Sequence, residues 1–596
     1  MSFIRQTNME IKSILRSKFL LIIGILVLLS SIAIPVIGVL TKPDPNGNYY
    51  PGGPIMYEKA MSMAMPAYGG DYYNGQEPIT VNGVTIMPDN PFYGNIQNLD
   101  QMDEYLDESA FTAPEALDLV IEMGDMELDY YLRAAQVITS YDDYRMNLVW
   151  NTTPLYDKFI YEKAGSTNLD ALKEALNYRY YVDPNTFEDT YVNISEADRQ
   201  AAIDKDDAYL NRLNDVIENN NFDEFITLSI EQQQTQIDSI NKSIEIQEQT
   251  IVEHPDQEEE LNRYIEDMKK QIKLITDSTI PMLQYRQEKH IVPGEDIWQN
   301  SAISSIENAN NQLAYSTLLS EEDYNKDPYL PQQYKSYDRY RTAIQAQIDK
   351  ANNDILVAQN SLDSDKPDMT FVPDGARNQT TNFLSYSALV ALFAVILGGW
   401  LMASEFQLGT IRLLMIRPKT RFKILMSKFT GALVLCLGVY IVGAVLNMVT
   451  IGICYGFSDF GFPNYTASGA VGFFAYYLPK FLACGVTIIF GYCTAFFLST
   501  VAKNIAVAVA VPAVCFVMSI VGMSMVAYTE AAHWIAWTPI PFVQMSQFFT
   551  QYSPVQTMIS NGVPLSLGYG IGMLLGLSLI LTVIATWVFK KKDITN

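Results

Sequence analysis

The chain has 596 residues, of which 49% are hydrophobic and 18% charged, and its net charge is −26. The charge is divided unevenly: residues 42–382 hold 61 of the 66 acidic and 25 of the 40 basic side chains, and the remainder is apolar and net basic. This division excludes a uniformly soluble protein and indicates two solvents, water around residues 42–382 and lipid around the rest. We expect no nucleic-acid partner.

Cysteine and histidine are scarce. All five cysteines lie in the apolar C-terminal part, and the three histidines show no spacing with them that is typical of a zinc site. The acidic region holds no cysteine and therefore no disulfide framework. We expect no metal and no cofactor.

The first long predicted element is an apolar run at residues 19–40, which meets the roughly 20 residues that a helix needs to cross a bilayer. A signal peptide is the alternative, but its apolar core would be shorter and a small-residue cleavage site would follow it. We expect residues 1–41 to contain a retained first transmembrane helix.

Residues 42–382 are predicted to form one large, mainly α-helical extracytoplasmic domain. The pair Asn82-Gly83 lies between two short runs rich in β-branched residues, which predicts a tight β-hairpin at residues 79–86. Helical patterns follow at residues 114–140, 168–178 and 332–361.

The clearest pattern in this domain is a pair of apolar stripes on either side of His254-Pro255. Two antiparallel helices that share a seam would bury both stripes, so residues 230–275 are predicted to form a helical hairpin resembling a short coiled coil. The stripes consist of Ile230, Ile237, Ile240, Ile244 and Ile251, then Leu261, Ile265, Met268, Ile272 and Ile275.

Five more apolar runs, at residues 383–403, 429–455, 481–500, 505–528 and 564–589, bring the total to about six transmembrane helices. Basic residues gather before the first run, between the second and third, between the fourth and fifth, and after the sixth. These positions share one face, so we expect both termini in the cytoplasm, residues 42–382 outside, and a multi-pass cell-membrane protein. Lys480 is the one basic exception on the outer face.

Two features of the C-terminal region leave alternatives open. Residues 530–563, with Trp534 and Trp537, suggest either short re-entrant helices or an aromatic belt alone. In the sixth run Gly568, Gly572 and Gly576 recur every four residues, a spacing that lets helices approach closely, either within the subunit or across a dimer.

The segment 403–428, between the second and third runs, is predicted to be a cytoplasmic amphipathic element that Pro418 interrupts. Glu405 and Arg412 lie two turns apart on one helical face. The order of residues resembles type 2 ABC transporter permeases, in which this stretch reaches the cytoplasmic ATPase. The matching positions are Glu405, Gly409, Thr410, Arg412, Leu414, Arg417, Pro418, Arg421 and Lys428.

The N-terminal residues 9–16 also resemble the interfacial helix of that family. The resemblance, over residues 1–41 and 383–596, implies the permease subunit of an ATP-driven exporter, with a second permease subunit (as homodimer or heterodimer), membrane lipid and a cytoplasmic ABC ATPase as partners. The chain itself has no GxxxxGK[ST] phosphate loop and no GxSxG or HExxH motif. We therefore expect no enzyme activity in this polypeptide.

Two other classes of function remain possible from the residues alone. A surface scaffold or receptor of the phage-infection (Pip) or secretion type would also place a coiled-coil domain between the first two spans, and a membrane sensor would bind a ligand there. The spans carry almost no charge, which disfavours an ion-driven carrier and permits an amphipathic or lipidic cargo.

Overall fold

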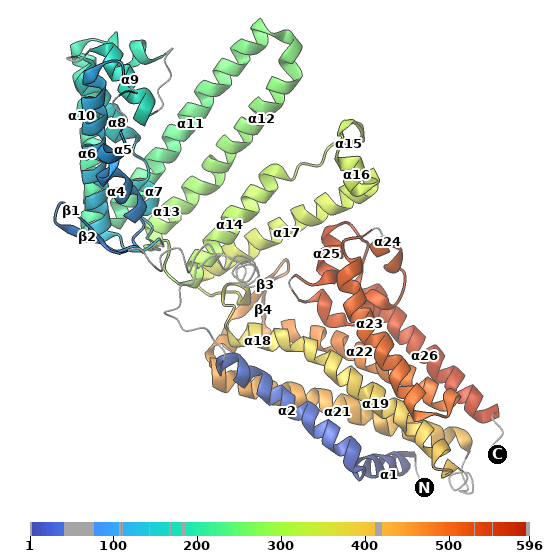
Figure 1. Ribbon diagram of the computed structural model, residues 1–596. Helices are drawn as coiled ribbons and strands as arrows, with labels where there is room; N and C mark the ends of the chain where they lie inside the picture. Colours follow the sequence, from blue (N-terminus) through green and yellow to red (C-terminus); the bar gives the residue numbers. More distant parts are fainter. Residues whose placement is uncertain are drawn as a thin grey trace. The chain divides into compact units, whose positions relative to one another are not determined.

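The computed structural model describes residues 3–40, 77–106, 109, 111–141, 143–165, 168–180, 186–411, 420–529, 531–550 and 552–591. The chain divides into two compact units, Asn48–Ile303 and the pair of segments Met1–Gly47 and Ser304–Asn596 (Figure 1). The division falls inside α14 (Trp298–Tyr315), so that residues 304–382 group with the apolar helices rather than with the rest of the acidic insert.

The unit of residues 48–303 begins, in its described part, with the predicted β-hairpin. Strands β1 (Ile79–Val81) and β2 (Val84–Ile86) pair antiparallel with Ile79 opposite Ile86. Asn82 and Gly83 join them with φ of 49° and 81°, the two positive values that a type I′ turn requires.

Helices make up most of this unit. Its first helices are α4 (Tyr93–Asp100), α5 (Met102–Tyr105), α6 (Pro114–Val137), α7 (Met146–Val149), α8 (Thr153–Ala164), α9 (Leu169–Arg179), the π-helix η2 (Glu188–Val192) and α10 (Glu196–Asn219). Side-chain caps fix several starts: the Ser195 hydroxyl accepts a hydrogen bond from the Asp198 amide, which sets the start of α10.

The predicted helical hairpin is present. Helix α11 (Phe222–Glu253) ends before Pro255, a short 3₁₀ turn η3 (Pro255–Gln257) reverses the chain, and α12 (Glu258–Leu274) returns along α11 (Figure 1). Ile244, Ile265 and Met268 are buried together in the seam. The returning helix continues through a π-turn, η4 (Ile275–Thr279), into α13 (Ile280–Lys289), where Pro281 has no N–H for a normal helical bond.

Six helices of the described chain are long and apolar enough to cross a membrane, as the sequence predicts for a membrane protein. They are α2 (Lys18–Leu40), α18 with α19 (Ala376–Asn382 and Tyr386–Gln407, joined by η6, Phe383–Ser385), α21 (Arg421–Tyr455), α22 (Phe473–Ala502), α23 (Ile505–Val526) and α26 (Leu567–Lys591).

Three of the six spans start several residues earlier than their apolar runs, and the first of these is the α18–α19 span, which starts at Ala376 rather than at residue 383. Helix α21 begins at Arg421 because the Thr420 hydroxyl accepts from the Lys423 amide and caps it. Helix α22 begins at Phe473 and carries Pro479 and Lys480 inside it, whereas the sequence prediction starts after them. Hydropathy alone missed these starts because charged or proline residues precede or interrupt the apolar runs. Pro479 lies beyond the first turn of α22, where it removes one helical hydrogen bond without ending the helix.

The span made of α18 and α19 is the innermost of the six: 72% of its apolar stretch is buried, against 17% of that in α23. Two glycines let neighbouring helices reach it. A Cβ on Gly398 would lie 2.8 Å from the Tyr492 carbonyl oxygen of α22, and one on Gly399 would lie 2.7 Å from the Ala508 carbonyl oxygen of α23. Pro512 has no N–H to donate to the Ala508 carbonyl, so α19 packs against the part of α23 where one helical hydrogen bond is missing.

A side chain of α21 also satisfies a backbone group that a proline in α2 leaves unpaired. Pro35 in α2 cannot donate to the Ser31 carbonyl, and the Asn447 side chain of α21 supplies that hydrogen bond at 3.0 Å. Asn447, the notable polar residue of the predicted spans, thus has a packing role here. Inside an apolar bundle such a bond also fixes the register of the two helices.

The remaining elements of this unit are short, apart from α1 and α17. They are α1 (Phe3–Leu15), α15 (Glu321–Lys326), α16 (Leu330–Tyr334), α17 (Tyr337–Ser364), η5 (Met369–Phe371), η7 (Ser458–Gly461), the paired strands β3 (Pro463–Thr466) and β4 (Gly469–Gly472), α24 (Ala531–Ile535), η8 (Ile540–Phe542), η9 (Met545–Phe548) and α25 (Pro554–Ser560). The described part of residues 530–563 is therefore a series of short helices, and Trp534 and Trp537 are both exposed on it.

Candidate functional site

A buried lysine joins three elements at one end of the helix bundle. The ammonium of Lys428, one residue before the apolar run of α21, donates to Glu10 Oε2 of α1 and to Glu405 Oε1 of α19, each at 3.0 Å. The side chains are 8%, 9% and 20% exposed in the order Lys428, Glu10, Glu405. Because a charge at such depth is costly without partners, the three groups stabilise one another only when α1, α19 and α21 are all in place.

Helix α1 turns its polar face inward. Gln6, Thr7 and Glu10 are buried against α21, whereas Phe3 and Ile4 are exposed. Gly431 of α21 allows this approach, since a Cβ there would already lie 3.3 Å from the Thr7 carbonyl oxygen. An exposed apolar face opposite an anchored polar one is the arrangement of a helix that lies in a membrane interface.

The end of α19 holds Glu405 in position. Gly409 follows the helix with φ of +70°, a left-handed conformation that closes helices and favours glycine. The chain then turns so that the Thr410 hydroxyl donates to Glu405 Oε2. No described atom lies within 4 Å of a Cβ built on Gly409, so within this chain the glycine is required by its backbone angle rather than by a close approach.

The other predicted coupling residues fall into two groups. Arg412, Leu414, Arg417 and Pro418 lie outside the described residues, and so does the predicted placement of Arg412 on the face of Glu405. Arg421 is described: it starts α21 and donates to the Lys590 carbonyl at the end of α26, at 3.3 Å. Glu405 and Thr410 thus lie at or just after the end of α19, and Arg421 lies at the start of α21. Hydrogen bonds inside the chain hold each of these side chains.

The glycine stripe of α26 makes no helix contact within the described chain. Gly568, Gly572 and Gly576 are exposed, and Cβ atoms built on Gly572 and Gly576 meet nothing within 4 Å. Of the two alternatives, packing of this stripe inside the subunit is absent among the described residues, and contact across a dimer stays a prediction. Gly570 is the glycine that packs closely, against the ring of Phe542.

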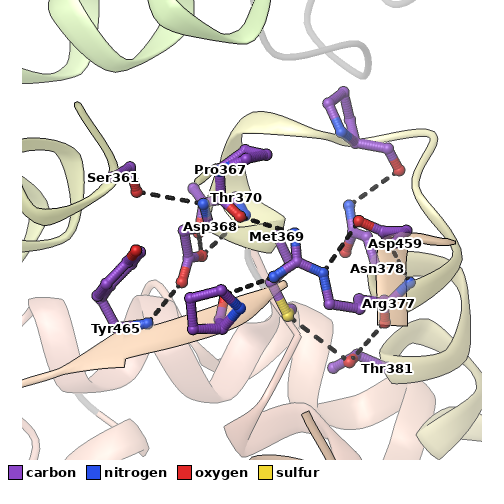
Figure 2. A network of polar contacts seen from close by, with 12 residues as sticks. Ser361, Pro367, Asp368, Met369, Thr370, Arg377, Asn378, Thr381, Asp459 and Tyr465 are labelled. Atoms are coloured by element: carbon purple, nitrogen blue, oxygen red, sulfur yellow. Dashed lines mark hydrogen bonds and ion pairs between the residues drawn. The ribbon is translucent and has the colours of Figure 1, made fainter. Parts of the chain in front are cut away.

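A second polar network lies at the opposite end of α19 (Figure 2). Arg377 of α18 is fully buried; its Nε donates to Asp459 Oδ1 at 3.0 Å, and its other nitrogens donate to the Pro463 and Pro367 carbonyls. Asp368, in the same network, accepts from Thr370 and from the Tyr465 amide. These bonds tie the chain entering α19 to the connection between α21 and α22.

Neither cluster offers catalytic or metal chemistry among the described residues, where no group of three His, Cys, Asp or Glu side chains could hold a metal ion. The polar groups of both clusters are occupied by one another. What such an arrangement can do is transmit force, because a rigid, mutually dependent set of contacts moves as one body.

Sequence reasoning missed Glu10 and Arg377 as structural partners, and it named Lys428 only as a matching position. A signal was present: Glu10 is the one acidic residue before the first span, and Arg377 is the basic residue just before the second. Their partners are hundreds or tens of residues away, however, and no local pattern identifies them.

Comparisons with known proteins cover part of the chain. The model of a family described as "Protein of unknown function (DUF2705)" matches residues 355–595, from the end of α17 through α26. The Bacillus subtilis (strain 168) protein named "Uncharacterized protein YhcI" is 40% identical over 76 residues, which are 12% of this chain and 24% of that protein. The chain therefore aligns with about a quarter of that relative's length, and neither name states an activity.

Proposed function

We propose that this chain is the membrane permease subunit of an ATP-driven exporter and works with a separate cytoplasmic ABC ATPase. The observation that carries the proposal is the buried Glu10–Lys428–Glu405 cluster, which joins α1, α19 and α21 where the segment between the second and third spans begins and ends. A partner that pushes on that segment would move all three helices together.

The positions of the basic residues set the proposed orientation of the chain across the membrane. Arg5, Lys12, Arg16, Arg421 and Lys503 all belong to the face that carries the lysine cluster, and basic loops stay in the cytoplasm. The insert of residues 42–382 is then extracytoplasmic. Helix α1, with its exposed apolar face, lies in the inner interface and sets the height of the cluster in the membrane.

In the mechanism that we infer, two permease chains form the path and two ATPase subunits bind beneath them. Closure of the ATPase pair on ATP displaces the segment 403–428, and the lysine cluster passes the displacement to α1, α19 and α21. Glu405 serves as a positioning residue in this scheme, since it holds both Lys428 and Thr410. Because the chain has no nucleotide-binding loop, ATP hydrolysis takes place in the partner.

The test is purification of the tagged full chain from its native host, with detection of any ABC ATPase that accompanies it. Glu405→Ala should still insert into the membrane, because a neutral residue is easier to place at the interface. It should recover several-fold less ATPase, or leave ATP hydrolysis by the reconstituted complex unresponsive to the permease. Asp459→Asn is the matched control: it weakens a buried ion pair at the other end of the same bundle and should leave ATPase recovery unchanged.

The two failures are distinguishable. If no ATPase accompanies the wild-type chain, the permease proposal is rejected. If Glu405→Ala recovers as much ATPase as wild type and couples as well, only the role of Glu405 is rejected.

A surface scaffold or receptor is the second candidate, and the long hairpin of α11 and α12 favours it. Val252 and Tyr264, on the two arms of that hairpin, are both exposed, which would suit contact with another macromolecule. Under this alternative a deletion of residues 233–272 would abolish function in cells. Under the permease proposal the same deletion leaves ATPase recovery intact.

A further inference from the structure

Lys480 is a cation inside α22, a helix long and apolar enough to cross a membrane. Helix α22 begins at Phe473, so that Lys480 lies about 10 Å along it at 1.5 Å per residue. This start of α22 is at the end of the bundle opposite to Lys428, since α21 runs away from Lys428 and α22 returns. A charged side chain within a span is costly and is retained where it has a partner or a ligand.

The described structure gives Lys480 aromatic rings but no carboxylate partner. Its ammonium lies 3.5 Å from the ring centroid of Tyr476, one turn nearer the helix start, and 5.4 Å from that of Phe549. Asp368 is the acidic group whose charge acts on Lys480, but the two are too far apart for an ion pair. Both Asp368 oxygens already accept hydrogen bonds, from Thr370 and from the Tyr465 amide (Figure 2).

Lys480 does not lie on the exposed apolar face of α22. Phe474, Leu478 and Leu482 form the exposed apolar stripe of this part of α22. Lys480 instead shares its face with the buried Tyr477 and Cys484. Two turns further on, Thr487 accepts from the Met545 amide, so the segment containing η9 and Phe549 packs along that face.

We propose that Lys480, Tyr476 and Phe549 form a binding site for the anionic head group of an amphipathic molecule in the membrane. Lys480 supplies the positive charge for a phosphate or carboxylate, and the two rings hold the ammonium and exclude water on either side. The site needs neither ATP nor an ATPase, so it stands apart from the permease proposal.

The experiment is a lipid titration of the purified, delipidated full chain by native mass spectrometry, with dioleoyl phosphatidylglycerol and dioleoyl phosphatidylcholine as probes. Lys480→Met should weaken phosphatidylglycerol binding about tenfold, the size expected of one charge-assisted contact, and leave phosphatidylcholine binding unchanged. Lys480→Arg should keep wild-type binding. Lys503→Met is the matched control, because Lys503 lies over the ring of Phe406 at the other end of the same helix.

Undiminished phosphatidylglycerol binding by Lys480→Met would overturn the proposal, as would an equal loss in Lys503→Met. Misfolding should not cause the loss of lipid binding in Lys480→Met, because removing a charge from a span should raise thermal stability. Millimolar inorganic phosphate distinguishes the sources of the anion. Competition by phosphate supports a site for free anions as well, and its absence supports a site that requires the acyl chain.

Discussion

Replacing Lys428 by methionine tests whether the three-residue cluster holds the bundle together. The variant keeps the length and apolar stem of the side chain but leaves Glu10 and Glu405 facing each other without a cation. Removing one member of a buried ion pair costs about 3–5 kcal/mol, because the remaining charge stays desolvated. The side chains are 8–20% exposed, so little solvent screening is available to reduce that cost.

The assay is thermal unfolding of the detergent-solubilised full chain followed by fluorescence-detected size-exclusion chromatography. Lys428→Met should lower the midpoint by several degrees. Replacing Glu10, Glu405 and Lys428 together by methionine should restore most of the loss, since buried ion clusters can be exchanged for apolar groups at little cost. A single variant as stable as wild type would refute the reasoning, and so would a triple variant no more stable than the single.

Three further outcomes follow from the structure. Gly398→Ala should cost about 1–3 kcal/mol because its Cβ would meet a backbone oxygen at 2.8 Å, whereas Gly438→Ala, with nothing within 4 Å, should not destabilise; thermal unfolding measures both. Ile244→Asp should speed amide hydrogen exchange throughout α11 and α12, whereas Ile246→Asp, at a side chain 52% exposed, should not. Burial, with the charge of Asp157, raises the pKa of Asp206 to about 6. The folded state therefore holds this proton more tightly than the unfolded state, and the unit of residues 48–303 loses stability as pH rises from about 4 through 6. Asp206→Asn should remove this pH-dependent loss, roughly 1–2 kcal/mol in the free energy of unfolding. Hydrogen exchange of the α10 amides, corrected for the pH dependence of the intrinsic exchange rate, measures it.

Features that depend only on neighbouring residues could be predicted from the amino-acid sequence. Six apolar runs of about 20 residues predict six candidate spans, because span length is a local property that the bilayer sets. The Asn82-Gly83 turn and the isoleucine stripes around His254-Pro255 were predicted for the same reason. Turn geometry and helical periodicity act over a few residues.

The pairing of distant polar groups could not be predicted in this way and is visible only in the three-dimensional structure. Lys428 pairs with Glu10, more than 400 residues earlier, and Arg377 pairs with Asp459 across the connection between α21 and α22. Gly568, Gly572 and Gly576 of α26 have the spacing of a contact face, yet close approaches between helices occur instead at Gly398 and Gly399 of α19 and at Gly431 of α21. Such contacts depend on the rotation and register of whole helices against one another, and many side chains far apart in the chain set these jointly.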